Sequence, residues 1–117
     1  MSTFRWSIYL ANLDPVIGSE QGKTRPVLVI SEEEINNVLP VVNVLPLTSL
    51  KEGRRIYPNE VLISKTKNGL DKDSIVLCYQ IRALDKKRLI KKLSEIDDAN
   101  IQEEIIEALS FQLGIER

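Results

Sequence analysis

A polar loop that runs straight into a proline-initiated apolar strand is the feature that most constrains how this chain can fold. The loop extends from Gly18 to Pro26, and the apolar run Val27–Ile30 follows at once. Proline fixes its own φ and biases the preceding residue toward extended geometry, so Arg25 is expected at a stiffened loop–strand junction. A guanidinium held in this way can offer its planar fork of donors to a phosphate. The alternative, for this segment alone, is an ordinary turn with Arg25 as a surface charge.

Short strands are expected over the first two-thirds of the sequence. Apolar and polar or small residues alternate from Trp6 to Ala11, the period of a half-buried strand, and Asp14-Pro15 ends the pattern. A polar connection with at most one helical turn is expected around residues 32–37, and Asn68-Gly69 is a strong turn signal. Further strands are predicted at Pro26–Ile30, Val41–Thr48, Glu60–Ile63 and Ser74–Leu84.

Helical patterns follow the last predicted strand. Asp85 is expected to cap a short lysine-rich helix over Lys86–Leu93, and Asp97 or Asp98 a longer helix that ends at Gly114. Ile101, Ile105 and Leu109 recur at helical spacing and predict an apolar face for core or dimer packing. The whole pattern predicts one domain over residues 1–117, mainly β (α+β): a small curled antiparallel β-barrel with a C-terminal α-helix packed on it.

Composition narrows the class of protein. The 117 residues suffice for one domain, and 43% hydrophobic and 28% charged residues are ordinary for a globular protein. No apolar run approaches the length of a membrane span, and the first residues lack the apolar region of a signal peptide, so a cytoplasmic protein is expected. The single cysteine, Cys78, lies in an apolar strand pattern, which favours a buried hydrophobe over a nucleophile.

The sequence contains no histidine, which restricts its chemistry. A histidine acid, base or metal ligand is excluded, and with one cysteine no zinc site is expected, so we predict neither metal nor cofactor. The net charge of −1 argues against a generally basic nucleic-acid-binding domain. Basic residues nevertheless predominate between Lys51 and Lys67, whereas acidic residues predominate after Glu95. These charges predict a basic surface on one side of the molecule, unless they are merely solvated.

A second motif resembles the first in construction. The β-branched run Val41–Leu45 ends in Pro46-Leu-Thr-Ser49, again a proline followed by polar residues. Together with Trp6–Pro15, Gly18–Pro26 and Asp73–Arg82, it resembles the MazF/PemK family of toxin endoribonucleases, in the family's order and over roughly Arg5 to Gly114. The resemblance implies an SH3-like barrel with a C-terminal helix, usually working as a homodimer, and cleavage of single-stranded RNA. It also implies a cognate antitoxin as partner.

The resemblance implies that Arg25 and Thr48 are catalytic. Cleavage of RNA without metal commonly uses the ribose 2′-OH as nucleophile, and a fixed guanidinium suits the charge that develops on the phosphorane. A threonine hydroxyl, both donor and acceptor, suits orienting the 2′-OH or the phosphate; the alternative for Thr48 is to satisfy backbone at a strand end. Glu20 is the third candidate, as proton acceptor or as a support for Arg25, with a solvated loop carboxylate as its alternative.

Single-stranded RNA binding calls for cations along a groove and flat side chains for stacking. Some family members carry further catalytic residues where this chain has Ser19, Leu77 and Tyr79. Because this chain lacks those residues, catalysis is expected to depend mainly on Arg25 and Thr48. Aromatic residues make up only 5% of the chain, which limits stacking. The candidate RNA-binding residues are Lys23, Lys51, Arg54, Arg55, Tyr57, Gln80 and Arg82.

Two other functions fit the same predicted fold. A CcdB-type gyrase poison binds its protein target and cuts nothing, and Leu113-Gly-Ile115 faintly resembles the end of such proteins, although Glu116 and Arg117 follow it here. A catalytically inert barrel that binds RNA is the other. Neither gives a purpose to the motifs around Arg25 and Thr48.

Overall fold

The computed structural model describes residues 4–65 and 69–117. Its strands are β1 (Ser7–Asn12), β2 (Thr24–Val29), β3 (Val41–Ser49), β4 (Glu60–Ile63), β5 (Ser74–Leu77), β6 (Arg82–Asp85) and β7 (Leu89–Glu95). The helices are α1 (Glu33–Val38) and α3 (Ala99–Leu113), with 3₁₀ turns η1 (Cys78–Gln80) and η2 (Lys86–Arg88). The predicted strands in the first half and the predicted C-terminal helix are therefore confirmed.

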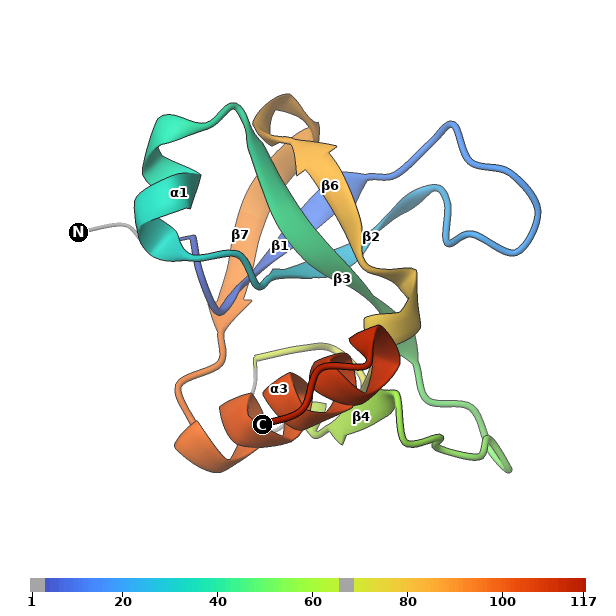
Figure 1. The fold of residues 1–117 in the computed structure, drawn as a ribbon. Helices are drawn as coiled ribbons and strands as arrows, with labels where there is room; N and C mark the ends of the chain where they lie inside the picture. The colour runs from blue at the N-terminus through green and yellow to red at the C-terminus, as the bar shows by residue number, and fades with distance from the viewer. Residues whose placement is uncertain (1–3, 66–68) are drawn as a thin grey trace.

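All recorded strand pairs are antiparallel, in the order β4-β5-β3-β2-β1-β7, and β6 also pairs with β3. The long strand β3 joins the two parts of the sheet, because its first half pairs with β6 and β2 and its last three residues pair with β5. The sheet curls strongly around the core, and α3 lies across one end beside β4 (Figure 1). The described strands do not close into a complete ring, but the predicted barrel-like fold with a C-terminal helix holds.

Two hydrophobic clusters hold the sheet together. Alternation along a strand sends successive side chains to opposite faces, so Leu28 packs with Leu45 and α3 in one cluster, while Val27 and Val29 pack in the other. Cys78 is fully buried in the first cluster, as predicted. Burial raises the pKa of its thiol to about 12, which makes the thiolate inaccessible near neutral pH.

The prediction of one strand over Ser74–Leu84 is wrong. The chain leaves β5 at Leu77, turns through η1 and resumes as β6 at Arg82. The turn takes up a register shift: from the pair Leu47↔Val76 to the pair Val44↔Arg82, β3 advances three residues and its partner six. The apolar pattern runs through the corner since Cys78 inside the turn is also buried, so periodicity gives no sign of the break.

The predicted helix over Lys86–Leu93 is also wrong. Only the three residues of η2 are helical, with the Asp85 side chain accepting a hydrogen bond from the Lys87 backbone N–H at 2.8 Å. The chain then forms β7, which pairs with β1. A helix of this length is marginal by itself, and the open edge of β1 offers a full ladder of backbone hydrogen bonds instead.

The C-terminal helix follows the sequence prediction closely. Asp98 caps α3 by accepting from the Asn100 backbone N–H at 2.8 Å, and Gly114 ends it with a left-handed φ of 70°. Ile105 is fully buried, and Ile101 and Leu109 pack against the same cluster. Of the predicted turn at residues 68–69, residue 68 lies outside the described residues, and Gly69 has a φ of 64°. Among the helices that the structure describes, none is long and apolar enough to span a bilayer.

Candidate active site

The site begins where β2 and β3 part. Their ladder ends at the pair Val27↔Pro46; beyond it β2 stays with β1 as far as Thr24, while β3 turns away to pair with β5. Arg25 and Thr48 each lie two residues beyond this last pair, and alternation along β2 puts Arg25 on the face of the sheet to which Val27 points. Both residues line a cavity of about 270 Å³ in this gap, together with Ser49. We call it the Arg25 cavity.

Arg25 is held by the loop that precedes it. Its Nε donates a hydrogen bond to the Gly22 carbonyl oxygen at 3.0 Å, and no residue in the ranges 4–65 and 69–117 accepts from its two Nη groups. A Cβ on Gly22 would approach the Asp14 Oδ1 atom and the Val16 side chain to 2.7 Å, so only glycine fits there without a shift. Asp14 Oδ1 in turn accepts from the Lys23 backbone N–H at 2.8 Å. The guanidinium is thus oriented through one edge and leaves the other edge for a ligand.

Thr48 lies between two cavities. It lines the Arg25 cavity and a second one of about 210 Å³, which we call the Lys51 cavity. Its side chain is half-buried, and no hydrogen bond of its hydroxyl is recorded among the described residues. The residues lining the Lys51 cavity are Gln21, Thr48, Ser49, Lys51, Arg54, Leu77 and Tyr79.

Glu20 does not join Arg25 and Thr48 in either cavity. Its Oε1 accepts a hydrogen bond from the Ile17 backbone N–H at 2.8 Å, which closes a turn inside the loop. The exposed side chain lines a third cavity, of about 470 Å³, with Tyr79, Gln80 and Arg82. Its geometry suits a support of the loop.

The guanidinium of Arg54 is already paired with a carboxylate of the same chain. Its Nη1 and Nη2 donate to the two carboxylate oxygens of Glu60 at 3.0 and 2.7 Å, and the guanidinium lies 5.9 Å from the centre of the Tyr57 ring. The Glu60 side chain is only 2% exposed. Burial by itself would raise the pKa of Glu60, but hydrogen bonds from Arg54 and from the Tyr57 backbone N–H outweigh it and hold the pKa below the usual range. Arg54 therefore fixes the base of the loop between β3 and β4.

The other RNA-binding candidates fall into two groups. Lys23, Lys51, Arg55 and Tyr57 are exposed on loops and available to a ligand. Gln80 and Arg82 instead bind the loop between β1 and β2, which we call the arginine loop (residues 13–23). Gln80 bonds the backbone of residues 19 and 21, and Arg82 Nη1 donates to the Leu13 carbonyl oxygen at 3.2 Å.

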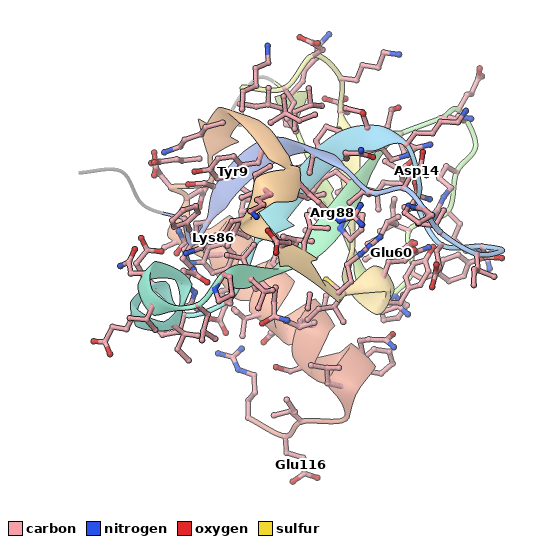
Figure 2. The ribbon with its side chains drawn as sticks, turned by 90° about the horizontal axis from the view of Figure 1, so that it is seen from above. Tyr9, Asp14, Glu60, Lys86, Arg88 and Glu116 are labelled. Atoms are coloured by element: carbon pink, nitrogen blue, oxygen red, sulfur yellow. The ribbon has the colours of Figure 1, made fainter. Side chains whose placement is uncertain are left out.

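Arg88 braces the same loop at its base, donating to the carbonyl oxygens of Asn12 and Asp14. Figure 2 shows Arg88 and Asp14 from above, on the side of the molecule away from Glu116. The arginine loop is therefore tied to the last part of the sheet at several points.

Sequence reasoning missed three polar residues that line the Lys51 cavity: Gln21, Ser49 and Tyr79. Ser49 adjoins Thr48 and could have been included on that ground. Tyr79 carries no sequence signal, because it owes its exposed position to the η1 corner that the strand pattern concealed. Within the described part of the chain, no group of three or more histidine, cysteine, aspartate or glutamate side chains could hold a metal ion.

A curled antiparallel sheet with a C-terminal helix, and an arginine facing a threonine where two strands part, defines the class of small barrel-like toxin nucleases. Comparisons with known proteins agree. A family model described as PemK-like, MazF-like toxin of type II toxin–antitoxin systems matches residues 4–113. The chain belongs to this family.

Individual members of the family are similar to this chain over nearly its whole length. Endoribonuclease MazF of Staphylococcus saprophyticus is 43% identical over 111 residues, which are 95% of this chain and 91% of that protein. The crystal structure of MazF from Deinococcus radiodurans has a TM-score of 0.79 at 30% identity, covering 95% of this chain and 96% of that one. A MazE–MazF crystal structure from the same organism has a TM-score of 0.72 at 31% identity, covering 98% and 97%. The chain is an endoribonuclease toxin, and the gyrase-binding alternative is not supported.

Proposed function

We propose that this toxin cleaves single-stranded RNA at specific sequences, without metal, by attack of a ribose 2′-OH on the adjacent phosphate. The observation that carries the proposal is the placement of Arg25 and Thr48 at one cavity, with the Nη edge of Arg25 and the hydroxyl of Thr48 both available. The two side chains supply hydrogen-bond donors at one phosphate, where the bond from the 2′-oxygen to phosphorus forms and the bond from phosphorus to the 5′-oxygen breaks. The 2′-OH proton passes to solvent water, and water protonates the leaving 5′-oxygen.

Arg25 stabilises charge in this proposal. Its two Nη groups bind non-bridging oxygens as negative charge grows on the phosphorane, and its Nε bond to Gly22 keeps the fork in a set orientation. Arginine does not lose its proton readily, because its pKa exceeds about 12. Thr48 orients the 2′-OH or the phosphate through its hydroxyl, which can both donate and accept. Glu20 enters as a support of the arginine loop.

The RNA strand extends from the scissile phosphate into the Lys51 cavity. Lys51 offers an exposed cation there. The loop that follows Lys51 carries a second exposed cation, Arg55, and an exposed ring, Tyr57, on which a base can stack. Lys23 adds a cation on the return arm of the arginine loop. Thr48 lines both the Arg25 cavity and the Lys51 cavity, so one strand bound at Arg25 and Thr48 can continue to Lys51.

A digest in excess EDTA tests the mechanism. Cleavage should persist, and the fragments should end in a 2′,3′-cyclic phosphate or 3′-phosphate with a free 5′-hydroxyl. Activity that disappeared with chelator and returned with magnesium would contradict the proposal. Mapping the 5′ ends of the fragments gives the sequence that is cut.

We further propose a cognate antitoxin as partner, a homodimer as the working unit and the cytoplasm, where mRNA is translated, as the place of action. The solved MazE–MazF complex of a 31%-identical relative supports the antitoxin. An extended acidic segment, disordered when free, could lay its carboxylates against Arg25, Lys51 and Arg55 in place of RNA phosphates.

A further inference from the structure

Gln80 holds the arginine loop by a bond pattern that resembles a strand pairing. Its Oε1 accepts from the Gln21 backbone N–H at 2.8 Å, and its Nε2 donates to the Ser19 carbonyl oxygen at 3.0 Å. The two bonded groups flank Glu20, just as one residue of a neighbouring parallel strand would bond the residues on either side of one position. The side-chain amide satisfies one donor and one acceptor of a loop that pairs with no strand at this point.

The clamp lies one peptide away from the atom that orients Arg25. Gly22 follows Gln21 directly, and its carbonyl oxygen accepts from Arg25 Nε at 3.0 Å. Fixing the Gln21 N–H therefore fixes the start of the segment that presents this carbonyl. Arg82 and Arg88 bind carbonyls of residues 12–14, on the outgoing arm of the loop, and so constrain a different part of it.

Gln80 itself is anchored in the core. It ends the η1 turn, whose first residue, Cys78, is fully buried and donates its backbone N–H to Asn59 at 3.2 Å. The Ile81 backbone N–H closes the turn on the Cys78 carbonyl at 3.3 Å. The amide that grips the loop thus starts from a packed part of the molecule, which allows it to impose a position rather than follow one.

We infer that Gln80 is a positioning residue, which sets the orientation of Arg25 through the backbone of Gln21 and Gly22. This inference rests on the proposed function of Arg25. It differs from the expectation that Gln80 reads RNA, because both ends of its amide are already bonded to the loop. The Gln80 side chain then affects the rate of the chemical step and not the affinity for the RNA.

Gln80→Glu is the sharpest variant, because it preserves shape and the acceptor but removes the donor to Ser19. Near neutral pH the carboxylate faces a carbonyl oxygen and the clamp opens. A small misplacement of a catalytic group can cost on the order of 100-fold in rate, so the single-turnover rate at saturating RNA should fall at least about tenfold. As the pH drops through the pKa of the introduced carboxyl, its proton restores the donor and the rate should return toward that of the wild type.

A matched control exists in the same chain. Gln102 also donates its Nε2 to a backbone carbonyl, that of Ile96 at 2.7 Å, but at the start of α3. Gln102→Glu loses a comparable bond and should leave the rate unchanged at every pH. Gln80→Met, uncharged and of similar length, should lose rate as Gln80→Glu does but without recovery at low pH, and it serves if the glutamate variant does not fold.

The readouts separate the outcomes. Binding to an RNA with a 2′-deoxy group at the cut site should stay within about twofold of the wild type for both Gln80 variants, since no direct contact is lost in this inference. A weakened affinity with an unchanged saturated rate would overturn it in favour of direct RNA contact, and so would unchanged rates. Failure of the wild type to cleave in EDTA would instead contradict the proposed function, and the two failures are therefore distinguishable.

Discussion

At the residue scale, Arg25 uses different edges of one guanidinium for two tasks. Nε is bonded to Gly22 and the Nη groups face the ligand, so a lysine at this position would keep the charge but lose both the anchor and the fork. We expect Arg25→Lys and Arg25→Ala to lower the single-turnover rate by roughly two to three orders of magnitude, by analogy with loss of one oxyanion donor. Thermal unfolding should be nearly unchanged. A rate close to that of the wild type in either variant would place the active site elsewhere.

Thr48 allows a similarly narrow test, because its hydroxyl and its methyl group can be removed separately. Thr48→Val keeps the shape and loses the hydroxyl, whereas Thr48→Ser keeps the hydroxyl. We expect the valine variant to cleave much more slowly than the serine variant at saturating RNA. Equal rates for the two variants would mean that the Thr48 hydroxyl takes no part in the reaction and that Thr48 has a structural role at the end of the strand.

At the element scale, the loop between β3 and β4 depends on the ion pair of Arg54 with Glu60. Arg54→Met should lower the unfolding temperature, because it leaves a buried carboxylate without its partner. The pKa of Glu60 is lowered in the folded protein, so the pair stabilises the fold above the unfolded pKa, about 4.3, and that contribution is lost as the pH falls through the folded value. The difference between wild type and variant should therefore be large at pH 7 and shrink at lower pH, below about 4. A pH-independent difference would argue for lost packing instead.

Arg55 on the same loop is exposed and gives the contrasting prediction. Arg55→Gln should weaken RNA binding and reduce the slope of log affinity against log salt by about 0.7, the value for one lost contact to single-stranded phosphate. Its stability should not change. Arg54→Gln is the matched comparison, since it removes the same charge from a neighbouring residue whose guanidinium is already paired with Glu60. An unchanged slope in Arg55→Gln would show that Arg55 is a solvated surface residue that does not contact RNA phosphate.

At the scale of the whole molecule, opposite charges lie on different elements. Lys51 lies beside Thr48, which also lines the Arg25 cavity, whereas acidic residues gather along α3. An acidic antitoxin segment and RNA should therefore compete for one face. We expect a short uncleavable RNA to displace a peptide from the antitoxin's C-terminal region, measured by fluorescence anisotropy. Simultaneous binding without mutual weakening would mean that inhibition acts at a distance.

Arg25 and Thr48 could be named together as candidates because the motifs Arg25-Pro26 and Pro46-Leu-Thr-Ser49 resemble those of the family, and the structure brings both residues to one cavity. The position of Glu20 was not predictable, because its carboxylate turns back onto Ile17 and its cavity shares no lining residue with that of Arg25. The availability of Arg54 could not be judged either, since composition counts its charge but does not reveal that Glu60 neutralises it.

The sequence by itself determined the elements whose signals are local. Alternation specified β1, the caps Asp98 and Gly114 specified α3, and an apolar setting specified the burial of Cys78. Tertiary structure decided what depends on pairing partners. The η1 turn breaks one apolar run in two because the register against β3 shifts between β5 and β6, and residues 89–95 form a strand because the edge of β1 was open. It also decided that Arg25 meets Thr48, because a register between two strands is a property of the assembled sheet and belongs to neither strand alone.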